Sequence, residues 1–347
     1  MPAIAGGDNA ACAPRQVRRD RLVGLWLLLV AAMVAVMILV GGATRLTDSG
    51  LSITEWKPIS GALPPMGSDA WAAEFAKYRE TAEYRLQNQG MRLSQFQSLY
   101  WWEWGHRLLG RLIGLVFAGP FLIFLTSGRL RGRALACTGL LALGGAQGAI
   151  GWWMVQSGLT DRLDVAPYRL AVHLGVAFLI LGGALWLGLE RFWAAQGGSG
   201  AWPKAVAAFL VLLCLQILAG AAVAGSDAGK AFADWPTIGG AWVPRDYAAL
   251  QPFWHNLFEN HAAVQFNHRT LGYLAGLAAL GLGVGVGRLG PYRARRWALA
   301  LAGVALAQAG LGVAVVVHVA PLSLSLLHQG GAVALFGLGV ALLSRLR

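Results

Sequence analysis

Long runs of apolar residues recur along the chain and carry very few charges. None of them alternates polar and apolar positions with period two, so they favour helices over strands. Only helices and closed barrels satisfy their backbone groups in lipid. We therefore expect an all-α integral membrane protein with eight transmembrane helices, each long enough for the ~20 residues that a bilayer core requires. The runs lie at about 22–44, 104–127, 134–156, 168–189, 204–224, 268–287, 297–319 and 322–344.

Composition and charge agree with a membrane location. The 347 residues are 56% hydrophobic and only 13% charged, which lies outside the range of ordinary soluble domains. The net charge of +12 would suit a protein that binds nucleic acid, but the basic residues flank the apolar runs instead of forming one soluble face. We therefore expect membrane lipid, and no nucleic acid, around this chain.

Basic residues cluster in short segments at alternate ends of the expected helices. By the positive-inside rule these segments are cytoplasmic, which places both termini inside and two long loops, about 45–99 and 225–262, outside. Within the first loop, the stretch 70–97 has amphipathic spacing and predicts an outer helix that lies on the membrane or caps the first half. The residues that set this orientation are Arg15, Arg18, Arg19, Arg21, Arg129, Arg131, Arg133, Arg191, Lys204, Arg288, Arg293, Arg295, Arg296, Arg345 and Arg347.

The chain contains an internal duplication. "DSGLSITEWKPISGALPP" (48–65) matches "DAGKAFADWPTIGGAWVP" (227–244), and "HRLLGRLIGL" (106–115) matches "HRTLGYLAGL" (268–277). Each half has an even number of helices, so both enter the membrane in the same orientation. This predicts two tandem four-helix bundles related by a pseudo-twofold axis. The expected division is a cytoplasmic leader 1–21, a first bundle 22–194, a linker 195–203 and a second bundle 204–347.

Four of the seven histidines are paired by this repeat, His106 with His268 and His173 with His328. All four lie in the first two turns of inward-running helices, so they share one depth in the outer leaflet. In each half, two imidazoles on neighbouring helices then face one bundle interior, as in bundles that hold a haem iron. A lone membrane histidine more often forms interhelical hydrogen bonds, and zinc needs three or four ligands. The repeated pair favours axial ligation of haem iron by all four histidines.

Two arginines directly follow histidines of this set. Arg107 and Arg269 are candidates to pair with anionic haem propionates near the outer surface. The alternative is that they snorkel to the interface or pair with an acidic loop residue such as Asp48 or Asp227.

The two halves differ in charge at one position. Glu103 lies one helical turn before His106, whereas the matching residue of the second half is the neutral Gln265. A carboxylate beside only one histidine pair indicates chemistry in the first half and a permanent cofactor in the second. The alternative is that Glu103 only forms an ion pair with Arg107 or Arg111.

Several motifs together resemble the haem A synthase family, which serves cytochrome oxidase assembly. The resemblance covers nearly the whole chain after the leader. The first outer loop is long and has no cysteine pair, which resembles the mitochondrial and alphaproteobacterial branch. The motifs are "GGATRLTDSGLSITEWKPISGALPP", "EWGHRLLGR", "AVHLG", "FNHRTLG" and "LLHQG".

The resemblance implies an oxidoreductase of the inner membrane. The family oxidises a ring methyl of haem O in successive steps to a formyl group, which gives haem A for cytochrome c oxidase. Carried over by position, His268 and His328 would hold a resident haem b, and His106 and His173 would hold the substrate haem O, with Glu103 as the catalytic carboxylate. The haem sites would face the periplasm.

Two other functions fit the histidines alone. A di-haem b-type electron carrier would keep both haems permanently, and a haem chaperone or transporter would bind one haem reversibly without chemistry. The sequence does not identify an electron donor. Haem O synthase and oxidase assembly factors are partners that only the resemblance implies.

Overall fold

The computed structural model describes residues 20–160, 162–193 and 200–347, and its regular elements there are helices apart from one isolated bridge between Ile238 and Ala241. Eight of the helices are long and apolar enough to cross a membrane. The prediction of an all-α membrane protein with eight spans is therefore confirmed. The spans are α1 (Arg21–Leu46), α4 (Leu93–Thr126), α5 (Ala134–Gln156), α6 (Pro167–Leu189), α7 (Ala201–Gly225), α9 (His261–Leu289), α10 (Tyr292–Val317) and α11 (Leu322–Leu346).

Local sequence signals mark where several of these helices begin. The Asp20 side chain accepts hydrogen bonds from the first-turn amides of α1, and the Asn260 side chain does the same for α9. Pro167 occupies the first position of α6, where a proline loses no helical hydrogen bond. These caps satisfy backbone donors that the helix itself leaves free.

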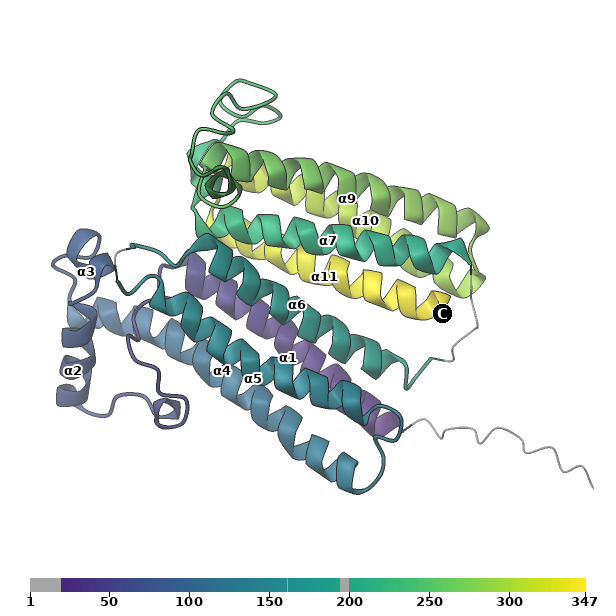
Figure 1. Cartoon of the computed structure of the whole chain (residues 1–347), viewed down its shortest axis with the longest axis horizontal. Helices are drawn as coiled ribbons and strands as arrows, with labels where there is room; N and C mark the ends of the chain where they lie inside the picture. The colour runs from purple at the N-terminus through teal and green to yellow at the C-terminus, as the bar shows by residue number, and fades with distance from the viewer. Residues whose placement is uncertain (1–19, 161, 194–199) are drawn as a thin grey trace, which may run out of the picture.

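The eight spans form two groups of four, which lie side by side in Figure 1. In the first group, α1 and α5 each pack against both α4 and α6; in the second, α7 and α10 each pack against both α9 and α11. Each group is thus a closed ring of four helices. The groups meet where α6 packs on α7 and α11, and where α1 packs on α11. A pseudo-twofold relation between them stays a prediction.

The ends of the two halves differ from the expected boundaries in one place. Most of the leader lies outside the described residues, as does most of the expected linker. The second half begins earlier than expected, because α7 already starts at Ala201. The start of α1 and the end of α11 lie at the end of the molecule opposite the long loops (Figure 1).

The stretch expected to form one outer helix, 70–97, is divided. It contains α2 (Ser68–Tyr78) and α3 (Ala82–Leu86), and its last residues already belong to α4. The prediction of a single helix here is wrong because the Thr81 side chain caps a new helix at Tyr84 N, and because Gly90 has a positive φ of 85° that ends the run. Tyr78, Phe96 and Tyr100 form a small aromatic core that joins these helices to α4.

The second outer segment is mostly irregular. It holds only α8 (Ala228–Ala231) and the short 3-10 helix η2 (Phe253–Leu257), while the first loop holds the 3-10 helix η1 (Ser60–Ala62). Asp48 and Asp227 each lie two residues past the last residue of α1 and α7, and both adopt left-handed φ values, 48° and 53°. The duplicated loops therefore leave their helices in the same way.

Arg45 joins the two halves at this end, as does the ion pair between Arg162 and Glu259. The Arg45 guanidinium contacts carboxylate oxygens of Asp48 at 2.9 Å, Asp164 at 3.4 Å and Asp227 at 3.1 Å. Asp48 and Asp164 belong to the first half, whereas Asp227 belongs to the second. Burial raises the pKa of Asp164, and Arg45 opposes that rise.

A second polar contact joins the halves within the membrane. Gln329 Nε2 on α11 donates to the Ile38 carbonyl of α1 at 2.8 Å. A Cβ at Gly42 would lie 1.7 Å from Gln329 Oε1, so only glycine allows this approach. Gly41, which contacts His106 of the first histidine pair, lies on the same turn of α1.

Candidate functional site

The histidines of the first half each lie against a glycine of an adjacent helix. His106 on α4 packs against Gly41 of α1, where an added Cβ would lie 3.2 Å from Nε2. His173 on α6 packs against Gly151 of α5, where a Cβ would lie 2.9 Å from Cε1. The Gln147 side-chain amide donates to the His173 carbonyl at 2.9 Å. Both imidazoles are half-buried among the helices.

The histidines of the second half have the same surroundings. His268 on α9 packs against Gly220 of α7, and His328 on α11 packs against Gly312 of α10, with added Cβ atoms 3.0 and 3.1 Å from the respective Cε1 atoms. Gln308 Nε2 donates to the His328 carbonyl at 2.7 Å. The four contacts therefore recur in sequence-matched pairs.

The two pairs differ in how closely their rings approach. The His268 and His328 rings lie in an edge-on, T-shaped arrangement, with centroids 6.3 Å apart and planes at 83°. Within the described ranges, a ring contact of this kind is not found between His106 and His173. The second pair is thus the more compact one.

The helices that carry each pair are not neighbours, and the expectation that they are is wrong. In the first ring α4 and α6 are both in contact with α1 and α5, which lie between them, and in the second ring α9 and α11 are separated in the same way by α7 and α10. The histidines therefore project from diagonally opposed helices. Side chains on such helices point toward each other across the interior of the ring, where two imidazoles could hold one haem.

The donor set fits an axial haem better than other metals. Imidazole–metal bonds are about 2 Å long, so two imidazoles on one ion have facing nitrogens about 4 Å apart, and ring centroids 6.3 Å apart suit this in the second pair. The buried Nδ1 atoms of His173, His268 and His328 have no close hydrogen-bond partner, and the backbone of Gln216 lies near His268 and that of Gln308 near His328. Among the described residues there is no group of three or more His, Cys, Asp or Glu suited to a metal ion.

Glu103 is almost completely buried and is held by four donors. Its Oε2 accepts from Ser52 Oγ at 2.8 Å and from Ile53 N at 2.7 Å. Its Oε1 accepts from Arg107 Nε at 3.1 Å and from Arg107 Nη2 at 2.5 Å. The ion pair considered from the sequence is therefore present with Arg107, and Arg111 does not take part. The carboxylate fastens the first outer loop to α4.

Arg107 completes the same attachment. Its Nη1 donates to the Glu55 carbonyl at 3.0 Å and its Nη2 donates to the Ile53 carbonyl at 2.8 Å. Neither Asp48 nor Asp227 pairs with it, because both contact Arg45 instead. Arg107 thus links the buried Glu103 carboxylate to two carbonyl groups of the first outer loop.

The second half has an attachment of opposite polarity. Gln265 is buried, and its Nε2 donates to the carbonyls of Ala228 and Phe232, while its Oε1 accepts from Arg269 Nη2. Arg269 Nη1 also donates to Asp234 O at 3.0 Å and Thr237 O at 2.8 Å. Where Glu103 accepts from its loop, Gln265 donates to its loop.

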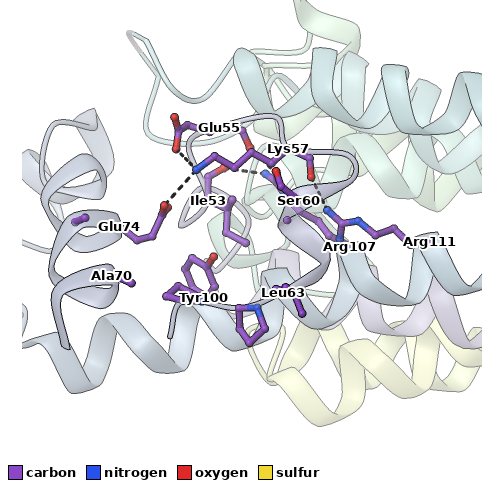
Figure 2. Close-up of a pocket in the computed structure, with 14 residues that line it drawn as sticks. Ile53, Glu55, Lys57, Ser60, Leu63, Ala70, Glu74, Tyr100, Arg107 and Arg111 are labelled. Carbon is purple, nitrogen blue, oxygen red and sulfur yellow. Dashed lines mark hydrogen bonds and ion pairs between the residues drawn. The ribbon is translucent and has the colours of Figure 1, made fainter. Parts of the chain in front are cut away.

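A cavity of about 290 Å³ lies between the first outer loop, α2 and α4 (Figure 2). Arg107 and Arg111 line it on the α4 side, and Ser60 and Leu63 line it on the loop side. Figure 2 shows Tyr100 on the wall between α4 and α2. The cavity therefore adjoins the Glu103 attachment and shares Ile53, Glu55 and Arg107 with it.

Sequence reasoning did not find several residues of this site. Gly41 and Gly220 were detectable, because they match at the same offset as Asp48 and Asp227. Ser52 and Arg45 have no counterpart of the same type in the second half, so the repeat gave no signal for them.

Similarity to other proteins extends over nearly the whole chain. A family model described as cytochrome oxidase assembly protein (COX15-CtaA) matches residues 24–340. Proteins named heme A synthase are 50% identical in Maricaulis maris, over 92% of this chain and 94% of the relative, and 51% identical in Azorhizobium caulinodans, over 95% and 94%. A heme A synthase of Paracoccus denitrificans is 50% identical over 90% of this chain and 85% of its own length. The chain belongs to the cytochrome oxidase assembly protein family COX15-CtaA.

Proposed function

We propose that this chain is a haem A synthase, an oxidoreductase that converts haem O to haem A. The relatives of this name cover nearly all of the chain at about half identity. The observation that carries the proposal within the molecule is the pair of matched histidine sites, each built from two diagonal histidines and two glycines.

The two sites would have different tasks. His268 and His328 would hold a resident haem b, because their rings lie close together across the interior of the second ring of helices. His106 and His173 would hold the substrate haem O in the first half. Bound haem iron supplies the oxidation chemistry, and the protein supplies position and surroundings.

Glu103 would act from a fixed position. Four donors hold its carboxylate one helical turn from His106, so it would stay near the substrate site and would stabilise positive charge that develops near a ring methyl or move protons there. The same bonds close the first outer loop over α4 and keep bulk water away from this side. Arg107 and Arg269 would bind the haem propionates only through N–H groups that do not already donate to loop carbonyls.

We infer the orientation from the basic segments. Both termini would be cytoplasmic and the histidines would lie toward the periplasmic side of the bacterial inner membrane. Haem O synthase and oxidase assembly factors would be partners on the cytoplasmic or lipid-facing surfaces.

The test is mass-resolved haem analysis of membranes that contain this chain beside a source of haem O. Wild type should produce haem A or its alcohol precursor. His106→Ala should keep the resident haem b and lose conversion, whereas His268→Ala should lose the resident haem. If wild type left haem O unchanged and kept two b haems, an electron carrier would be the better description; reversible haem O binding without conversion would indicate a chaperone.

A further inference from the structure

Arg111 is a cation with no acidic partner in the part of the chain that the structure describes. Its Nε donates to the Pro58 carbonyl and its Nη2 donates to the Lys57 carbonyl, each at 2.8 Å. Its Nη1 is buried and has no hydrogen-bond partner. Neutral carbonyls leave the charge of a guanidinium uncompensated, so this position favours an anion.

The cavity beside Arg111 contains a second free donor. Tyr100 lines it, and its side chain is only 6% exposed. Its hydroxyl makes no hydrogen bond to another described residue, although a buried tyrosine hydroxyl usually finds a partner. Figure 2 shows the hydroxyl on the side of the cavity that faces the loop. A ligand with acceptor oxygens would satisfy the Tyr100 hydroxyl and would lie beside the Arg111 guanidinium, which lines the same cavity.

The other charges of the cavity wall cancel one another. Lys57 contacts Glu55 at 2.7 Å and Glu74 at 3.5 Å, and Lys77 contacts the same two carboxylates at 2.5 and 3.0 Å. These two lysines and two glutamates form a closed, neutral group. The unpaired charge of Arg111 therefore makes the cavity favour a negatively charged ligand.

The loop at the entrance of the cavity carries exposed apolar side chains, of which Leu63 lines the cavity itself. Ile59, Leu63 and Met66 are 87%, 77% and 79% exposed, which is unusual for large apolar side chains that face water. Arg111 holds the start of this segment against α4, whose Leu112 and Leu115 are also exposed. The apolar entrance therefore adjoins the surface that α4 presents to lipid.

The depth of Arg111 agrees with a lipid headgroup. It lies 15 residues before Thr126, the last residue of α4, which is about 23 Å along a helix. The hydrocarbon core is about 30 Å thick, so the Arg111 backbone lies just inside the outer boundary and its side chain reaches outward. Phosphate groups of the outer leaflet lie at that level.

We propose that this cavity binds the phosphate of an outer-leaflet phospholipid. The phosphate lies beside the Arg111 guanidinium and accepts a hydrogen bond from Tyr100, and the acyl chains pass Leu63 toward the exposed Leu112 and Leu115 of α4. A haem propionate is a poorer fit, because His106 points about 140° away from Arg111 around α4. The proposal does not depend on the haem A synthase activity.

The second half should lack this site. The residue that matches Arg111 is Tyr273, and its hydroxyl already accepts a hydrogen bond from Trp235 Nε1 at 3.1 Å. The structure therefore assigns one such phospholipid to each chain.

The test is native mass spectrometry of the full-length protein, delipidated in detergent and titrated with phosphatidylglycerol or phosphatidylethanolamine. Diacylglycerol with the same acyl chains tests the phosphate, and inorganic phosphate tests a free anion. Wild type should retain one phospholipid, and Arg111→Leu should weaken its binding by about tenfold or more, because charged hydrogen bonds contribute about 1.5–3 kcal/mol each. Arg162→Leu, which removes an exposed arginine paired with Glu259, should change nothing.

Two milder variants keep the test valid if Arg111→Leu does not fold. Tyr100→Phe should weaken phospholipid binding several-fold, and Arg111→Lys should retain part of it. Equal retention of diacylglycerol, equal binding of inorganic phosphate, or unchanged phospholipid binding in Tyr100→Phe and Arg111→Leu would each overturn the proposal.

Discussion

Glu103 and Gln265 occupy matching positions in the two bundles and fasten their outer loops with opposite hydrogen-bond polarity. Glu103 accepts from Ser52 and from the Ile53 amide, whereas Gln265 donates to loop carbonyls. The loop conformations thus select the residue type, because a carboxylate facing carbonyls would be repelled and an amide group facing donors would leave them unpaired.

Exchanging this polarity in the first half should loosen its loop. Glu103→Gln removes the charge that pairs with Arg107, and breaking a buried ion pair typically costs about 3–5 kcal/mol. We expect faster hydrogen exchange in residues 50–61 and loss of most haem O conversion, with the resident haem retained. Glu80→Gln, an exposed carboxylate of the same outer region, serves as the control. Full conversion with an unchanged loop would show that the charge has no part in either.

A methyl group at Gly312 should disturb the resident haem site. Its Cβ would lie 3.1 Å from His328 Cε1, so the imidazole must move by a few tenths of an ångström. Gly312→Ala is expected to lower haem content and shift the absorption spectrum of purified protein. Gly303→Ala on the same helix has open space around its added Cβ and should leave the spectrum intact. If both variants kept the wild-type spectrum, the glycine contact would not position His328.

Removal of Arg45 should weaken the junction between the halves. Arg45→Met leaves Asp48, Asp164 and Asp227 close together with only Lys230, which contacts Asp227 at 3.0 Å, to offset their charge. We expect a lower Tm at pH 7.5 and a smaller loss at pH 5, because acid neutralises carboxylates that repel one another. Arg133→Met, at an exposed pair with Glu190, should have little effect. A Tm deficit that did not shrink in acid would point to lost packing instead.

Because of Glu83, the outer helices should become less stable as the pH rises from about 4.5 to 8. Burial raises its pKa from 4.5 to about 8, although a hydrogen bond from Tyr78 opposes the shift. The folded protein therefore holds this proton more tightly than the unfolded chain does, and stability falls as pH rises between about 4.5 and 8. Thermal melting from pH 5 to pH 9 should show this decline in wild type and a smaller one in Glu83→Gln. Equal slopes in the two proteins would assign the decline to other groups.

The sequence predicted the parts of this fold that depend on composition and periodicity. The eight spans follow from apolar runs, and the matched histidines follow from the duplication. The diagonal placement of His106 and His173 did not follow, because sequence order does not say which helices of a ring are adjacent. The division of 70–97 into α2 and α3 depends on one cap at Thr81 and one positive φ at Gly90, which an amphipathic pattern does not reveal.

The roles of the charged residues were harder to predict. From the sequence, Glu103 could pair with either Arg107 or Arg111. The fold decides between the two arginines, because the Arg111 guanidinium donates to loop carbonyls instead. Ser52, which donates a hydrogen bond to Glu103, lies about fifty residues from it along the chain. No local spacing rule joins residues across such a loop.

Gly41 and Gly42 make α1 a wall shared by both halves, because Gly41 admits His106 of the first half and Gly42 admits Gln329, the neighbour of His328 in the second. After the duplication, amino-acid substitutions at this turn of α1 were therefore restricted by two side-chain contacts at once. A half from a distant relative would therefore have to match this turn, so chimaeras that join halves of two parents should work only when both parents carry the two glycines of α1 and the glutamine of α11.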